Sequence, residues 1–110
     1  MTLAYDRDRL VELFGNDPKT LAEVEREFFD TARDAAREIA GTDDLAVIAR
    51  AAHRVKGASG MIGAGPLHRL AEIVEHAAKA HDLAGVRRLQ GDLDREVLRI
   101  AEQAALDPSG

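Results

Sequence analysis

The sequence predicts an all-α protein: an antiparallel, up-down-up-down four-helix bundle with a short additional helix at the N-terminus. Ala, Glu, Lys, Leu and Arg make up 56 of the 110 residues, whereas aromatic residues make up 4%, a composition typical of long helices. Apolar residues recur at alternating steps of three and four along most of the chain, which is the spacing of one helix face. We expect a single domain over residues 1–110, because two domains would each be too small for a dependable core.

The first predicted helix, residues 5–14, is short and amphipathic, and the Gly-Asn pair that follows it is a common helix ending. Asp17 and Pro18 then have the residue types of a helix cap and of a first helical position. A second helix is therefore expected over residues 18–40. Its apolar face consists of Leu21, Val24, Phe28, Ala32, Ala35 and Ile39.

The third predicted helix covers residues 43–62 and follows Gly41. Thr42 has the residue type of its cap, and Asp43 and Asp44 then lie at the positive end of the helix dipole. Its apolar face consists of Leu45, Ile48, Ala52, Val55, Ser59 and Ile62.

The fourth predicted helix, residues 66–81, begins at a proline after a glycine-rich break, and the fifth, residues 83–106, begins after the turn at Asp82. Residues 107–110 are expected to fray. Four long helices with short connections predict the antiparallel bundle, with the first helix packed across one end. The two apolar faces consist of Leu67, Leu70, Val74 and Ala77, and of Val86, Leu89, Leu93, Val97, Ile100 and Ala104.

Charge and composition exclude several classes of function. The formal net charge of −5 argues against a nucleic-acid-binding protein, which needs many cations to neutralise phosphates. The absence of Cys excludes a disulfide scaffold, a thiolate zinc site and a cysteine nucleophile. No apolar run reaches the ~20 residues of a membrane span, and no basic-then-apolar leader opens the chain. We therefore expect no membrane association and a cytoplasmic location.

Positive charge is concentrated in one part of this acidic chain. Residues 45–71 contain no Asp or Glu but contain Arg50, Arg54, Lys56 and Arg69. Such a basic island suggests an acidic or phosphorylated partner, although bases can also cluster by chance in a stretch rich in Ala and Gly.

His53 is the most distinctive residue of the third predicted helix. At about 100° per residue it lies about 130° from the centre of the apolar face, so we expect its ring at the surface or on the flank of the bundle. Lys56 and Gly57 follow three and four residues later, which places both beside the ring. Gly60 continues the same strip by one turn.

Two glycines inside a helix need a reason, because each weakens the helix by about 1 kcal/mol relative to alanine. One interpretation is that Gly57 ends the helix and a loop follows. The other is that bulk is excluded so that the backbone of another protein can approach the imidazole. The apolar face continues through Ser59 to Ile62, which favours the second interpretation.

An exposed imidazole beside an ammonium is a suitable phosphoryl acceptor. Imidazole is largely neutral at cytoplasmic pH, so one ring nitrogen keeps a free lone pair, and a lysine ammonium can neutralise phosphoryl oxygens. A lone surface histidine usually has no such role, so the interpretation depends on the combination of His53, Lys56 and the glycines.

Residues 53–63 read HRVKGASGMIG and resemble the signature of histidine-containing phosphotransfer (HPt) domains of multistep phosphorelays. That signature is H-x-x-K-G, then small residues, an aliphatic residue and Gly, and the helical layout extends the resemblance over most of the chain. The resemblance implies that His53 is phosphorylated and that Lys56 screens the charge of the phosphoryl group. The docking residues expected around it are Arg50, Arg54, Gly57, Gly60 and Lys79.

Glu75 lies 22 residues after His53, where HPt domains often place a Gln or Glu that touches the active imidazole. By this resemblance its carboxylate accepts Nδ1–H and leaves Nε2 free to attack. Lys79 can pair with Glu75 or help to attract the partner. The alternative for both is an ordinary exposed ion pair worth tenths of a kcal/mol.

The resemblance also implies partners and cofactors. The partners are receiver domains of response regulators or of hybrid histidine kinases, which donate the phosphoryl group from a phospho-aspartate or accept it. Mg²⁺ is expected on the receiver, and no cofactor or metal on this chain. No glycine-rich phosphate loop follows a strand, so we expect a phosphoryl carrier without ATP-dependent kinase activity of its own. A completed four-helix core makes a monomer the expected state.

Three other interpretations remain open. His68, Glu72 and His76 recur at four-residue steps, the spacing of a metal-ligand stripe on one helix face, whereas His81 lies off that stripe. A sensor-kinase dimerisation hairpin also phosphorylates a helical histidine, but usually with an acidic residue next to it and a proline soon after, whereas Arg54 follows here. A purely structural or adaptor bundle is the third.

Overall fold

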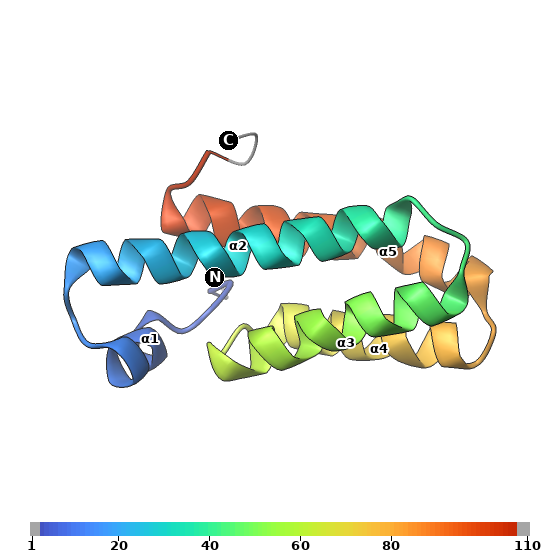
Figure 1. Cartoon of the computed structure of the whole chain (residues 1–110), viewed down its shortest axis with the longest axis horizontal. Coiled ribbons are helices and arrows are strands. Elements are labelled where there is room, and N and C mark those ends of the chain that lie inside the picture. The colour runs from blue at the N-terminus through green and yellow to red at the C-terminus, as the bar shows by residue number, and fades with distance from the viewer. Residues whose placement is uncertain (1–2, 108–110) are drawn as a thin grey trace.

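Four long helices form the body of the molecule in the computed structural model, which describes residues 3–107. The helices are α1 (Arg7–Phe14), α2 (Pro18–Ala40), α3 (Leu45–Met61), α4 (Gly65–Lys79) and α5 (Leu83–Ala104). From α2 to α5, each helix packs against the next and reverses its direction, and α2 also packs against α5 (Figure 1). They close into an antiparallel bundle within a molecule 43 Å long and 25 Å across, and α1 lies at one end against α2. The described residues contain no strand, so the predicted fold class is confirmed.

The apolar faces predicted from the sequence form the core. Most of their residues are buried, and burying one such large aliphatic or aromatic side chain contributes about 1.5–3 kcal/mol. The members that are only partly buried are Val24, Leu45, Leu70, Ala77, Leu89 and Ala104. Because these faces point inward, the remaining face of each helix is left to solvent or to partners.

The first helix begins at Arg7 and not at residue 5, because Asp6 is its cap and accepts hydrogen bonds from two amides of the first turn at 3.0 and 3.4 Å. The backbone of Tyr5 is engaged elsewhere: its amide donates to Gln103 Oε1 and its carbonyl accepts from Gln103 Nε2, at 3.3 and 3.0 Å. The buried Tyr5 hydroxyl donates to Glu25, and burial, followed by this hydrogen bond, raises the pKa of Tyr5.

The third helix begins at Leu45 and not at residue 43, and its cap is Asp44 and not Thr42. The Asp44 side chain accepts from two amides of the first turn at 3.0 and 3.4 Å, while Thr42 Oγ1 accepts from the Asp44 amide at 3.1 Å. Arg87 of α5 donates to the Thr42 carbonyl. This long-range contact holds the connection outside the helix.

The last two helices end two residues earlier than predicted. Beyond Lys79, His81 has a left-handed backbone with φ +58°, and beyond Ala104, Ala105 has one with φ +57°, which a helix cannot continue through. The boundaries at residues 61 and 65 differ from the prediction by one residue. Residues 108–110, predicted to fray, lie outside the described residues. None of the described helices combines the length and apolarity that crossing a membrane requires.

Candidate functional site

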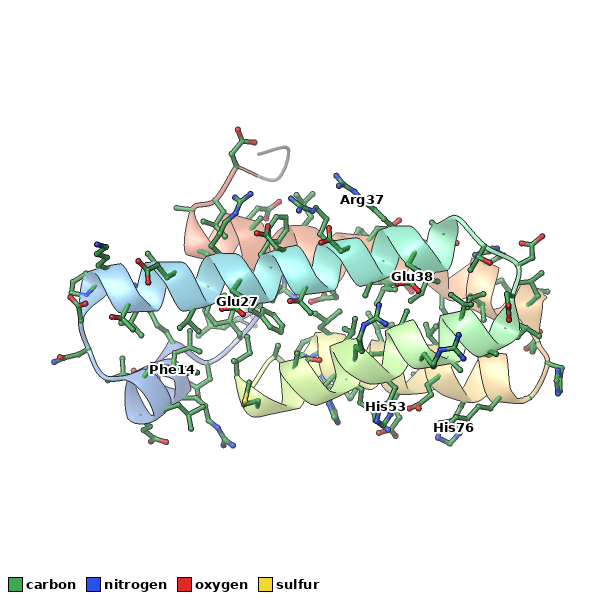
Figure 2. The ribbon with its side chains drawn as sticks, viewed as in Figure 1. Phe14, Glu27, Arg37, Glu38, His53 and His76 are labelled. Atoms are coloured by element: carbon green, nitrogen blue, oxygen red, sulfur yellow. The ribbon has the colours of Figure 1, made fainter. Side chains whose placement is uncertain are left out.

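His53 lies on the outside of α3, on the side away from α2 (Figure 2), and 67% of its side chain is exposed. Ala52, one residue before it, and Val55, two residues after it, are buried at 1% exposure. With these two residues directed into the core, the helix period turns the imidazole outward. The predicted surface placement of His53 is therefore confirmed.

Glu75 of α4 lies beside the imidazole and is 3% exposed. Its Oε2 atom is 2.9 Å from Nδ1 of His53 and 3.0 Å from Nζ of Lys79, while its Oε1 atom is 2.9 Å from Nζ of Lys56. One buried carboxylate thus bridges α3 and α4 and has three nitrogen partners. The alternative of an ordinary exposed ion pair is wrong for Glu75.

The hydrogen bonds between Glu75 and its partners stabilise the charged forms of Glu75 and Lys56. The hydrogen bond from Lys56 lowers the pKa of Glu75 the most, the bonds with Lys79 and His53 lower it further, and together they outweigh burial and bring it from 4.5 to about 2. The same bond with Glu75 raises the pKa of Lys56. A carboxylate can only accept a hydrogen bond, so Nδ1 of His53 carries the proton and Nε2 of the neutral ring keeps its lone pair.

We expect the stability that Glu75 contributes to depend on pH. A carboxyl group whose pKa falls from 4.5 to about 2 on folding stabilises the native state above pH 4.5, and this contribution is lost as the pH falls toward 2. Glu75→Gln should therefore lower the free energy of unfolding at neutral pH, and its difference from wild type should shrink through that range. Urea unfolding at a series of pH values measures this difference.

Glu72→Gln is the matched control, since it changes a carboxylate on the same helix whose side chain is 52% exposed. It should show no comparable loss at neutral pH. A Glu75→Gln variant as stable as wild type at neutral pH, or one whose difference from wild type grows on acidification, would contradict the assignment.

The glycines of α3 lie inside the helix, which continues to Met61. The interpretation that Gly57 ends the helix is therefore wrong. A Cβ atom at Gly57 would meet nothing within 4 Å, whereas a Cβ atom at Gly60 would lie 3.3 Å from Nδ1 of His68. The packing of the chain itself does not require a glycine at position 57, but α4 closely approaches Gly60.

The arginines of the basic island differ in their surroundings. Arg50 and Arg54 line an open hollow together with His53, Glu75 and Lys79. Arg54 Nη2 also binds Glu38 Oε2 of α2 at 2.7 Å, and Glu38 lies on the side of α2 that faces α3 (Figure 2).

The three residues of the predicted metal-ligand stripe do not form a metal site. Nδ1 of His68 is 2.8 Å from the backbone carbonyl oxygen of Lys56, and Nε2 is 4.0 Å from Glu72 Oε2. His76 lies on the exposed surface of α4 (Figure 2). Within residues 3–107, no group of three or more His, Cys, Asp or Glu residues could hold a metal ion.

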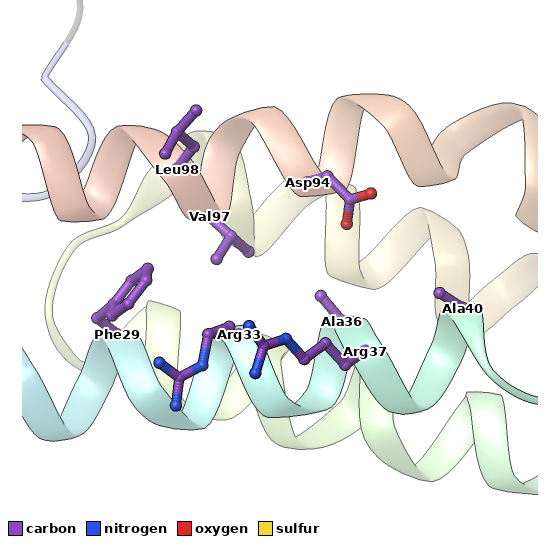
Figure 3. Close-up of a pocket in the computed structure, with 8 residues that line it drawn as sticks. All are labelled: Phe29, Arg33, Ala36, Arg37, Ala40, Asp94, Val97 and Leu98. Carbon is purple, nitrogen blue, oxygen red and sulfur yellow. The ribbon is translucent and has the colours of Figure 1, made fainter. Parts of the chain in front are cut away.

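A separate groove lies between α2 and α5 (Figure 3). Arg33 and Arg37 of α2 and Asp94 and Leu98 of α5 contribute to its lining, and burial raises the pKa of Asp94. The sequence gives no signal for this groove, because its two walls are distant along the chain. It shares no residue with the hollow at His53.

Comparison with known proteins agrees with this architecture. The Hpt domain family model matches residues 18–103, from the start of α2 almost to the end of α5. The phosphotransferase RcsD of Escherichia coli (strain K12) is 34% identical over 73 residues, which is 64% of this chain but 8% of that relative, so the chain spans a small part of its length. No solved structure matches the chain significantly. Since the family model covers most of the chain, including α3 with His53 and α4 with Glu75, the chain belongs to the Hpt domain family.

Proposed function

We propose that this protein is a phosphoryl carrier in which His53 accepts a phosphoryl group from the phospho-aspartate of a receiver domain and passes it to a second receiver domain. Membership of the Hpt family and the similarity to a phosphotransferase support a phosphotransfer role in a phosphorelay. The observation that carries the finer proposal is the 2.9 Å contact between Nδ1 of the exposed His53 ring and the buried Glu75 carboxylate. This contact makes Nε2 the nucleophile.

In the transfer step, Nε2 of His53 attacks phosphorus in line with the bond to the aspartyl oxygen. A P–N bond forms as the P–O bond breaks, and the electron pair of the broken bond returns to the aspartate carboxylate. Nδ1 keeps its proton, and the ionised Glu75 compensates the positive charge of the ring. Passing the group to a second receiver reverses these changes and returns the electron pair to Nε2.

The partners in this proposal are receiver domains of response regulators or of hybrid histidine kinases. Arg50 and Lys79 line the hollow around His53, and their charge suits a partner whose active site is acidic. Mg²⁺ is held by the receiver, and the proposal assigns no cofactor and no ATP-dependent kinase activity to this chain, which acts as a monomer.

The test is to incubate the purified chain with a panel of receiver domains phosphorylated on aspartate and to map the modification. We expect an acid-labile, alkali-stable phosphoryl group on the peptide that contains His53. Incubation with Mg²⁺ and ATP alone is the control and should give no label. A label on a different residue, or labelling from ATP without a receiver, would contradict the proposal.

We expect Lys56→Ala to slow transfer on the order of tenfold, because its ammonium lies at the site and can offset charge on the transferring group. The fold should remain, since the Lys56 side chain is only partly buried, at 27% exposure, Lys79 still pairs with Glu75, and alanine favours the helix. Rapid-quench measurements of phosphoryl transfer from a phosphorylated receiver determine the rate.

Lys19→Ala is the control for this change, because Lys19 is an exposed lysine at the start of α2. This variant should transfer the phosphoryl group at the wild-type rate. If Lys56→Ala transferred equally fast, Lys56 would have no charge-screening role.

A further inference from the structure

The last turns of α3 combine a site residue with two glycines. Lys56 provides the ammonium that binds Glu75, and Gly57 and Gly60 follow it within the helix. Glycine weakens a helix because it has more backbone freedom to lose than other residues. Without further support, this segment is the part of α3 most prone to local opening.

His68, in the first turn of α4, supports this segment. Its Nδ1 atom is 2.8 Å from the backbone carbonyl oxygen of Lys56. The ring packs closely against Gly60: a Cβ atom there would lie 3.4 Å from Cε1 and 3.3 Å from Nδ1 of the same ring, the latter tighter than ordinary van der Waals contact. A carbonyl oxygen can only accept, so Nδ1 of His68 carries the proton and donates it.

Other contacts hold the end of α3 one turn later. Arg9 Nε donates to the Met61 carbonyl at 3.2 Å, and the Asp6 amide donates to the Ile62 carbonyl at 3.3 Å. These bonds fix the chain where α3 ends, whereas His68 binds the residue that carries the ammonium.

We propose that His68 is a positioning residue for phosphoryl transfer and that it acts through Lys56. Its hydrogen bond fixes the backbone of Lys56, so that the ammonium remains at Glu75 and beside the imidazole of His53. The inference rests on the phosphoryl-carrier function proposed above. It also gives Gly60 a role within the chain, because a side chain at that position would crowd the His68 ring.

The first test compares three variants at position 68. His68→Leu removes the donor and should lower the maximal transfer rate about tenfold, with less than about a threefold change in the receiver concentration that gives half the maximal rate. His68→Asn has an amide nitrogen at the place of Nδ1 and should restore most of the rate, whereas His68→Gln carries its amide one bond further and should not. Equal rates for all three variants and wild type would overturn the proposal.

The second test is a double-mutant cycle, which separates action through Lys56 from general weakening of the fold. In a Lys56→Ala background, His68→Leu should cause almost no further loss of rate. An additive loss would show that His68 does not act through Lys56. The control is His76→Leu, a change at an exposed histidine of the same helix, which should leave the rate unchanged.

A third measurement needs no variant. The ¹⁵N chemical shifts of His68 in the wild-type protein should identify the tautomer with its proton on Nδ1, and a proton on Nε2 alone would overturn the proposal even if the variants failed to fold. The two proposals fail separately. A wild-type chain with no label on His53 contradicts the phosphoryl carrier, whereas normal labelling with no effect of His68→Leu contradicts the role of His68.

Discussion

Replacing His53 by Gln is expected to abolish phosphoryl labelling of the chain. The amide nitrogen of Gln has no lone pair available to attack phosphorus, so the nucleophile is lost. The fold should persist, because 67% of the His53 side chain is exposed and Gln is a good helix former. Labelling by a phosphorylated receiver and urea unfolding of the same samples measure the two effects.

The matched control is His76→Gln. His76 is an exposed helical histidine with a lysine three residues later, so it repeats the spacing of His53 and Lys56 on the neighbouring helix. We expect this variant to be labelled like wild type. If His53→Gln kept its label and His76→Gln lost it, the acceptor would be His76, and the site would have to be reassigned.

Replacing Gly57 by Leu is expected to block transfer almost completely while leaving the chain folded. The helix has open space at this position, since a Cβ atom would meet nothing within 4 Å, and leucine should raise helix stability by up to about 1 kcal/mol. The added side chain lies one turn after His53, on the surface that a receiver approaches in the proposed transfer. Receiver titration and urea unfolding should show lost transfer at equal or higher stability.

Gly91→Leu controls for the chemical change itself. Gly91 is an exposed glycine inside α5, and its nearest neighbour to an added Cβ atom is Arg95 Nη1 at an ordinary 3.8 Å. This variant should transfer normally. Wild-type transfer by Gly57→Leu would remove Gly57 from the docking surface, and equal inhibition by Gly91→Leu would point to an effect unrelated to docking at α3.

The order of the helices and their buried faces follow from local patterns. The bounds predicted for α2, residues 18–40, are those it has, because the Asp-Pro pair before it and the glycine after it act through neighbouring backbone groups. Apolar spacing similarly identifies which side of each helix is buried, since the helix period is a local property.

Two helix starts that the sequence predicts wrongly, those of α1 and α3, follow segments held by distant residues. Tyr5 lies outside α1 because Gln103 binds its backbone, and Thr42 lies outside α3 where Arg87 of α5 binds its carbonyl. These partners are 98 and 45 residues away along the chain. A capping pattern read over a few residues cannot include them.

Part of the candidate site likewise follows from the local sequence, and part depends on distant residues. The spacing of His53, Lys56 and Gly57 on one helix was enough to place an imidazole, an ammonium and a position without a side chain together on an outer surface. It could not show that Glu75 is buried with three nitrogen partners, or that His68 reaches the backbone of Lys56 past Gly60. Those contacts cross from α4 to α3, so they depend on how closely the two helices pack and on how far one is shifted along the other. The core of the whole bundle decides both.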